Sequence, residues 1–210
     1  QACHWPSAAN VVQECGTIEP GLLHSLSPRR SARSCRVAKC ELGPFRSMGD
    51  EPAAISADRC ILLRHGTPQP EDVDPLRPLT DEGQKEASST AAGLVQYLKK
   101  EDGKVRVLHS GKLRAQQTAE AVVGALKDAE FDVSIEACDG IAPNDDPAAG
   151  LLLVEQAAAP TVVLVGHLPH MGRFAASLVK RPAAAGALGG CFHPASGVVL
   201  QRAESGWEKT

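Results

Sequence analysis

The regular part of the chain opens with Cys60-Ile61-Leu62-Leu63-Arg64-His65-Gly66-Thr67. An apolar run passes there directly into arginine, histidine and glycine, which is typical of a buried strand that ends in a polar loop. Similar runs over residues 105–108, 133–135, 161–165 and 197–200 predict four more strands. Most of these runs are too uniformly apolar for a half-exposed sheet, so we expect both faces of the sheet to be covered.

Segments with helical periodicity alternate with these runs. In the first, apolar residues recur from Ala87 to Leu98 at helical spacing, and Thr80 is the N-cap candidate. Three further helices are expected: over Ala115–Leu126, from Pro147 after the cap candidate Asp146, and over about Pro169–Val179. This alternation predicts an α/β fold, a three-layer α/β/α sandwich with a mostly parallel central sheet.

Length and composition indicate a single globular domain. The chain has 210 residues, 43% of them hydrophobic, with a formal net charge of -3 and only 3% aromatic residues. A nucleic-acid-binding protein usually carries a basic face and stacking aromatics, so this class is disfavoured. No apolar run approaches the roughly 18 residues of a membrane helix, and we expect no membrane partner. We also expect a monomer.

The N-terminal part differs in composition from the rest. Residues 1–47 contain six basic and three acidic residues, with repeated Ser and Pro and no periodicity. We predict a disordered extension over residues 1–54 and a domain over 55–210. The extension is either a transit peptide for mitochondria or plastids or upstream sequence translated from an untranslated region, with Met48 as the natural start. Otherwise the cytoplasm is the expected compartment.

The seven cysteines are odd in number and form no Cys-x-x-Cys pair, so we interpret them as reduced thiols rather than as disulfides or zinc ligands.

Chemically useful side chains follow three of the predicted strands. Arg64 and His65 follow the first, Ser110 and Arg114 follow the second, and His167 follows the fourth. Ligands of such sheets bind at the carboxyl ends of the strands, so these residues should form one cationic cup. Phosphoryl transfer needs such a cup, because its transition state spreads negative charge over three oxygens. Neighbouring like charge should lower the pKa of a histidine there and keep it neutral and nucleophilic.

These motifs resemble the histidine phosphatase superfamily, whose fold is phosphoglycerate mutase-like, and within it the SixA-type phosphohistidine phosphatases. The resemblance rests on Arg64-His65-Gly66, on Arg77-Pro78-Leu79-Thr80 with Gly83, on Leu113-Arg114-Ala115 with Gln117-Thr118, and on His167-Leu168-Pro169. It implies no metal and no cofactor.

The same resemblance implies residue roles. His65 would be the phosphorylated nucleophile, and Arg64, Arg114 and His167 would hold the phosphoryl group. Asp74 would protonate the leaving group. Arg77 would either extend the phosphate pocket or pair with Asp74 or Glu82, and Ser110 would be a phosphate ligand or a helix cap. The remaining histidines in the domain, His109, His170 and His193, are interpreted as structural.

The expected activity is metal-independent removal of phosphate from phosphohistidine on a phosphotransfer protein. A small phosphorylated metabolite is the alternative substrate. A catalytically silent phosphate-binding regulatory module remains an alternative from another class, as does a zinc-binding interaction protein that uses the N-terminal cysteines.

Overall fold

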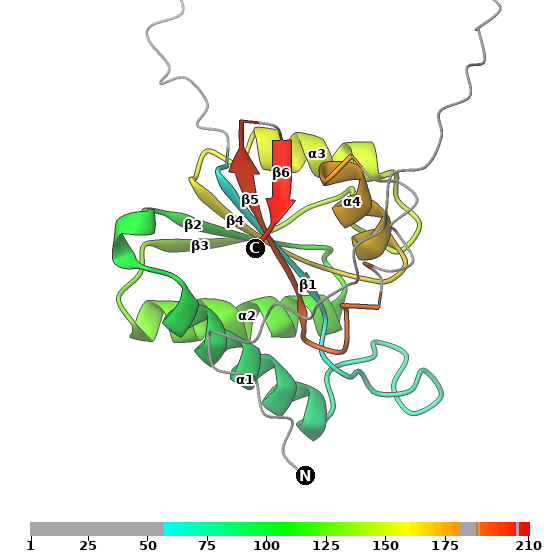
Figure 1. Cartoon of the computed structure of the whole chain (residues 1–210). Coiled ribbons are helices and arrows are strands. Elements are labelled where there is room, and N and C mark those ends of the chain that lie inside the picture. Colours follow the sequence, from blue (N-terminus) through cyan, green and yellow to red (C-terminus); the bar gives the residue numbers. More distant parts are fainter. Residues whose placement is uncertain (1–56, 181–187, 189, 205) are drawn as a thin grey trace, which may run out of the picture.

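The computed structural model describes residues 57–180, 188, 190–204 and 206–210 (Figure 1). The predicted extension over residues 1–54, with Met48 and four of the cysteines, lies outside the described residues. The domain prediction for residues 55–210 therefore stays a prediction at its N-terminal boundary.

A six-stranded sheet forms the centre of the domain, in the order β3-β2-β4-β1-β5-β6. Its strands are β1 (Arg59–Arg64), β2 (Val105–His109), β3 (Val133–Ala137), β4 (Thr161–Gly166), β5 (Gly197–Ala203) and β6 (Gly206–Lys209). The first four are mutually parallel. At one edge of the sheet, β5 runs antiparallel to β1, and β6 runs antiparallel to β5. The mostly parallel α/β sheet predicted from the sequence is confirmed.

The α-helices with described bounds are α1 (Asp81–Tyr97), α2 (Leu113–Asp128), α3 (Pro147–Glu155) and α4 (His170–Leu178). A short 3-10 turn, η1 (Lys100–Asp102), follows α1. Thr80 and Asp146 are the N-caps of α1 and α3, and each side chain accepts a backbone N–H of the first turn, as predicted. Among the described residues, no helix is long and apolar enough to cross a membrane.

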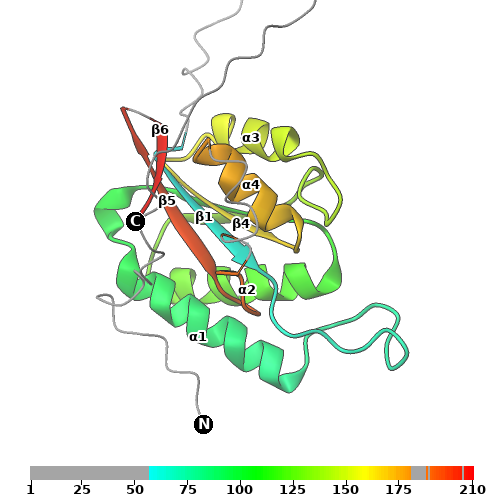
Figure 2. The ribbon, with the colours of Figure 1, turned by 45° about the vertical axis from the view of Figure 1, so that its right-hand side comes forward.

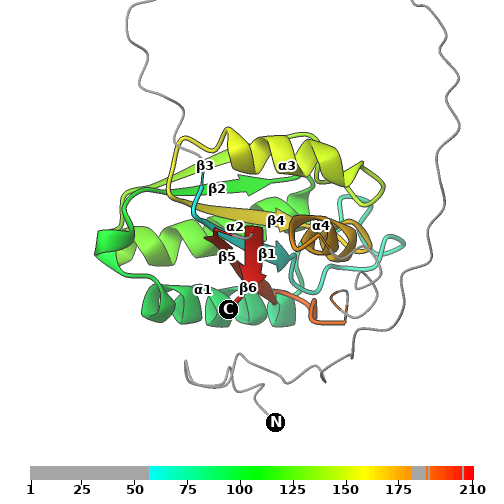
Figure 3. The same ribbon diagram turned by 45° about the horizontal axis from the view of Figure 1, so that its top comes forward.

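The helices cover the two faces of the sheet in pairs, α1 and α2 on one face and α3 and α4 on the other (Figures 1 and 3). Alternate strand residues supply the two cores, because successive side chains of a strand point to opposite faces. Ile61, Leu63 and Val163 pack with α1 and α2, whereas Leu62 and Leu164 pack with α3 and α4. The expected three layers are therefore present.

The edges of the sheet depart from the sequence expectation. β3 is an edge strand with no fully buried residue, so it is more exposed than its apolar start suggested. β6 was not predicted, because among its four residues only Trp207 is a large apolar side chain. Arg202 of β5 lies over the Trp207 ring, 4.8 Å from its centroid, and this contact helps to fix β6 against β5.

One close backbone approach positions the functional end of β1 over α1. A Cβ at Gly66 would stand 2.6 Å from the carbonyl oxygen of Gly83, and a Cβ at Gly83 would collide with the carbonyl oxygen of Thr67. Only glycine at both positions allows the first turn of α1 to pack directly on the segment that follows His65. Figure 2 shows the loop after β1 leaving the sheet next to the start of α1.

Candidate phosphoryl-transfer site

Three neighbouring strands deliver the candidate side chains to one edge. Arg64 pairs with Gly166 in the β1–β4 register, and the His65 N–H continues this pairing by donating to the Gly166 carbonyl at 3.1 Å. His65 and His167 therefore leave adjacent parallel strands side by side, with ring centroids 4.8 Å apart. Ser110 follows β2 on the other side of β4, and its Oγ lies 2.6 Å from Nε2 of His167. The structure brings these three residues together.

Two hydrogen bonds define the tautomer of His65. Nδ1 lies 2.7 Å from the carbonyl oxygen of Gly66, and since a carbonyl only accepts, Nδ1 carries the proton. Nε2 lies 3.2 Å from Nε of Arg114, which only donates, so Nε2 is the acceptor. His65 is thus a neutral imidazole whose Nε2 lone pair points toward Arg114. This is the state in which a histidine can attack phosphorus.

The pKa values of both histidines are lowered. Burial is the main cause for His65, whose pKa falls to about 4, and the charges of Arg114, Arg64 and Arg77 lower it further. Burial also lowers the pKa of His167 to about 3, with contributions from His65, Arg114 and Lys112. Like charge, the cause expected from the sequence, is therefore the smaller effect, and removal of the charged ring from water is the larger one.

Arg114 lies at the second position of α2, as predicted, next to a helix start without a side-chain cap. Lys112 is the N-cap residue, and its side chain bonds no backbone N–H. The first-turn N–H groups and the helix dipole therefore add to the attraction for an anion. The alternative that Ser110 caps this helix is wrong, because Ser110 bonds His167 instead.

The arginines around His65 form no ion pair with a carboxylate in the described part of the chain. Ion pairs in the described part of the chain involve Arg59, Lys100 and Arg106, and none includes Arg64, Arg77 or Arg114. Arg64 donates to the carbonyl of Phe192 at 3.1 Å, and Arg77 donates from Nε to the carbonyl of Gln69 at 3.2 Å. The predicted ion pairs of Arg77 with Asp74 or Glu82 are absent there. Such a cluster attracts an anion with several negative oxygens.

Asp74, the predicted proton donor, lies in the loop between β1 and α1. Its Oδ1 accepts the N–H of Leu76 at 2.9 Å, so the carboxylate also shapes a local turn. Glu71 in the same loop is the carboxylate whose charge raises the pKa of Arg114, against burial and Arg77, which lower it. Of these two loop acids, Glu71 acts on the arginine cluster through Arg114, whereas the Asp74 carboxylate bonds within its own loop.

Several supporting residues were not predicted as part of the site. The carboxylate of Glu86 in α1 accepts both the N–H and the hydroxyl of Thr67, at 2.8 and 3.0 Å. Thr118 in α2 accepts the Gly66 N–H at 3.0 Å and donates to the Arg114 carbonyl at 2.8 Å, which ties the nucleophile loop to the arginine. Thr118 stood in a quoted motif, but no sequence pattern marked Glu86.

The segment before β5 also supports the nucleophile. The N–H of Ala195 donates to the His65 carbonyl at 3.1 Å, and the N–H of Arg64 donates to the Ser196 carbonyl at 2.9 Å. Thr90 of α1 in turn donates to the Ala195 carbonyl. Backbone groups make these contacts, so residue types could not reveal them.

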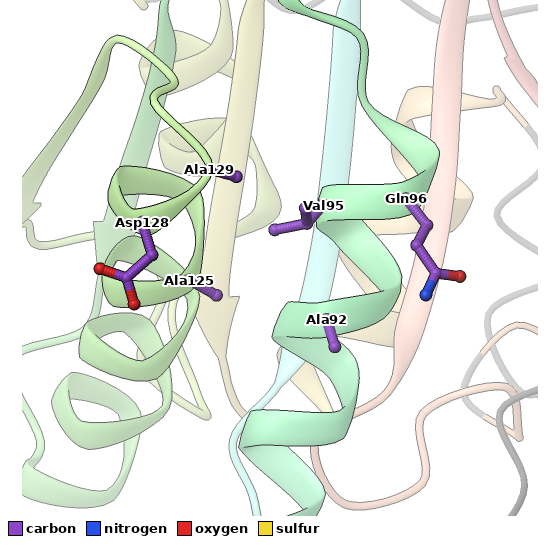
Figure 4. A pocket seen from close by; sticks show the side chains of 6 residues that line it. All are labelled: Ala92, Val95, Gln96, Ala125, Asp128 and Ala129. Atoms are coloured by element: carbon purple, nitrogen blue, oxygen red, sulfur yellow. The ribbon is translucent and has the colours of Figure 1, made fainter.

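Two surface hollows of the described part lie away from the histidines. One is lined by residues of α1 alone, including Lys85 and Ser88. The other lies between α1 and the end of α2, where Val95, Ala125 and Asp128 are among the lining side chains (Figure 4). Neither contains a member of the histidine cluster, so the chemistry and not the depth of a pocket identifies the site.

Comparisons with known proteins agree with this geometry. Neither protein-family models nor curated protein sequences match the chain. Among solved structures, the chain is similar to SixA from Agrobacterium tumefaciens, with 27% identity and a TM-score of 0.55, over 72% of this chain and 94% of that one. The protein histidine phosphatase SixA in complex with tungstate has 24% identity, a TM-score of 0.55 and the same coverage. A phosphoserine phosphatase from Entamoeba histolytica shares the fold at 15% identity and a TM-score of 0.53, over 72% of this chain and 94% of that one.

The lowered histidine pKa values predict an acid-sensitive fold. In the unfolded chain a histidine binds a proton below about pH 6.5. Folded His65 and His167 stay neutral to about pH 4 and 3, so acid favours the unfolded state throughout that window. The free energy of unfolding should fall from pH 6.5 to pH 5, by up to about 1.4 kcal/mol per pH unit and histidine. Urea unfolding at a series of pH values measures this.

The window from pH 6.5 to 5 isolates the histidines, because a carboxyl such as Asp102, with its pKa lowered by Arg59, titrates below it. His65→Ala should flatten the curve in this window. An unfolding free energy that is constant from pH 7 to 5 would contradict the burial of neutral histidines.

Proposed function

Since the chain belongs by fold to the histidine phosphatase superfamily, we propose that it is a phosphatase that works through a phosphohistidine at Nε2 of His65. One observation carries this proposal. A buried imidazole with Nδ1 protonated and Nε2 unprotonated stands among arginines that form no ion pair with a carboxylate in the described part of the chain. A neutral nucleophile and an excess of positive charge are the two requirements for attack on a phosphate dianion.

In the first step, the phosphoryl group binds between Nε2 of His65 and Arg114. Arg114 then exchanges its hydrogen bond to Nε2 for one to a phosphoryl oxygen. Arg64 and Arg114 neutralise the charge on the equatorial oxygens, and His167 donates to one of them from Nε2, which exchanges its hydrogen bond to Ser110 for one to the phosphoryl oxygen. The lone pair of Nε2 then forms a bond to phosphorus while the bond from phosphorus to the leaving group breaks. The leaving group departs with that electron pair. The Gly66 carbonyl stabilises the positive charge that develops on the ring, because it keeps accepting the Nδ1 proton.

In the second step, water attacks the same phosphorus from the side that the leaving group has vacated. The bond from Nε2 to phosphorus breaks, its electron pair returns to the ring, and the proton that the water loses passes to a phosphoryl oxygen, so that dihydrogen phosphate leaves. The low pKa of His65 assists this step, since the imidazole is a better leaving group when its protonated form is disfavoured. Neutral His65 is then ready for the next cycle.

As substrate we propose phosphohistidine on a protein. The similarity to SixA from Agrobacterium tumefaciens supports this choice. The site chemistry supports it as well, because a nitrogen leaving group can be protonated before the bond to phosphorus breaks. No strong acid is then required, which suits a cluster rich in cations.

A small phosphate ester is the second candidate, and the acids of the loop between β1 and α1 favour it. An alkoxide leaving group needs a proton during bond cleavage. We assign this role to Asp74, with Glu71 as the competing carboxylate.

The first experiment compares the wild-type chain with His65→Ala on a phosphohistidine-carrying protein and on p-nitrophenyl phosphate. Loss of the nucleophile should lower kcat/KM at least about a thousandfold on both. A substrate with a radioactive phosphoryl group should label the wild-type enzyme in an acid-labile, alkali-stable form. The His65→Ala variant should not be labelled. His193→Ala is the matched control, because His193 is exposed. Turnover without a labelled enzyme would contradict the covalent route, and phosphate binding without turnover would favour a silent regulatory module.

A second comparison tests the acid. Asp74→Asn should slow phenyl phosphate, a poor leaving group, by roughly a hundredfold or more, and should hardly affect p-nitrophenyl phosphate, whose leaving group needs no proton. Glu71→Gln is the matched control from the same loop. If Glu71→Gln shows the dependence on the leaving group and Asp74→Asn does not, the assignment to Asp74 is wrong.

A further inference from the structure

The loop between β1 and α1 begins directly after His65 and displays two exposed aliphatic side chains. Val73 is 67% exposed and Leu76 is 71% exposed, the two most exposed large hydrophobic residues in the described part of the chain. Both lie within four positions of one loop, which projects from the body of the domain beyond the carboxyl end of β1 (Figures 1 and 2). Single exposed aliphatics are ordinary, but two at the tip of one loop form a small apolar patch.

Internal bonds hold the loop in one shape. The N–H of Gln69 donates to the Pro78 carbonyl at 2.7 Å, and the N–H of Asp74 donates to the Pro70 carbonyl at 3.0 Å. The Asp74 carboxylate accepts the Leu76 N–H at 2.9 Å. Prolines at 68, 70, 75 and 78 restrict the backbone further. The loop therefore holds Val73 and Leu76 in one arrangement before a partner binds, which lowers the entropy cost of binding.

The base of the loop belongs to the site itself. The loop begins directly after His65, and Thr67 is held by the Glu86 carboxylate. It ends at Arg77, whose side chain bonds the Gln69 carbonyl across the loop. The positive charge of Arg77 also acts on His65. A large substrate, such as a protein, therefore contacts the outer part of this loop when its phosphoryl group reaches His65. A small substrate does not extend that far.

The charged residues next to Val73 indicate which partner surface would bind there. Glu71, Asp72 and Asp74 flank Val73 in the sequence, and Glu71 and Asp72 are exposed, so the patch is acidic on the Val73 side, whereas Arg77 follows Leu76. A complementary surface carries an aliphatic side chain flanked by Lys or Arg. A small phosphate ester would gain nothing from this patch, because the cationic cluster already binds its phosphoryl group.

We propose that Val73 and Leu76 form a docking surface for the protein that carries the phosphoryl group, next to its phosphorylated side chain. This inference rests on the proposed function and deepens it. The patch makes the enzyme selective for protein-bound phosphate, since it contributes to binding only when a folded partner extends past the phosphoryl group.

The double variant Val73→Ser, Leu76→Ser in the full chain tests the docking surface. Its kcat/KM should fall about tenfold or more on a histidine-containing phosphotransfer domain phosphorylated with phosphoramidate, through a higher KM. On p-nitrophenyl phosphate it should stay within about twofold of the wild type. Leu152→Ser is the matched control, because Leu152 is also an exposed aliphatic, at 54%, but lies on α3. It should leave both activities unchanged.

Three results would overturn the docking surface. The first is equal activity of wild type and double variant on the protein substrate, which leaves the proposed function intact. The second is a wild type that hydrolyses free phosphohistidine as efficiently as the phosphorylated domain. The third is a wild-type dimer in sedimentation that becomes monomeric in the double variant with unchanged activity, which would assign the patch to self-association. A wild type inactive on every phosphorylated compound would instead refute the proposed function.

Discussion

The hydrogen bond from His65 Nδ1 to the Gly66 carbonyl, at 2.7 Å, sets the chemistry of the whole site. It fixes the proton on Nδ1 and leaves the Nε2 lone pair directed at Arg114. The Gly66 carbonyl belongs to the segment that packs on the first turn of α1, and Gly66 and Gly83 let these two backbones approach closely. Burial then keeps the ring neutral, and the charges of the neighbouring arginines act in the same direction, although the hydrogen bond to the Gly66 carbonyl opposes them.

The rest of the fold holds positive charge near that ring. Arginines close to one another repel, as the effect of Arg77 on the pKa of Arg114 indicates, and hydrogen bonds to backbone carbonyls hold two of them here. Phe192 holds Arg64, Gln69 holds Arg77, and the first turn of α2 holds Arg114. Thr118 and Glu86 join these elements to the loop after His65. The domain is thus prepared for an anion, whose arrival would stabilise charges that now lack carboxylate partners in the described part of the chain.

The sequence was sufficient for the layers and for the residues at strand ends. Uniformly apolar runs predict buried parallel strands, and a polar residue directly after such a run must lie at the edge of the sheet, which is why His65, Ser110 and His167 could be placed together. The helix caps Thr80 and Asp146 followed from local side-chain chemistry. Contacts made by backbone groups distant in sequence, such as Ala195 with His65, carry no residue signature. The same holds for the burial that dominates the histidine pKa values, because burial depends on the assembled layers.

Identification of the atom that accepts the phosphoryl group tests the proposed mechanism most directly. The enzyme would be prepared with nitrogen-labelled histidine, phosphorylated by substrate, and unfolded in alkali, where phosphohistidine persists. Coupling between phosphorus and nitrogen in its NMR spectrum then identifies the modified nitrogen, and peptide mapping identifies the residue. We expect phosphorus on Nε2 of His65. Phosphorus on Nδ1, or on any other side chain, would contradict it.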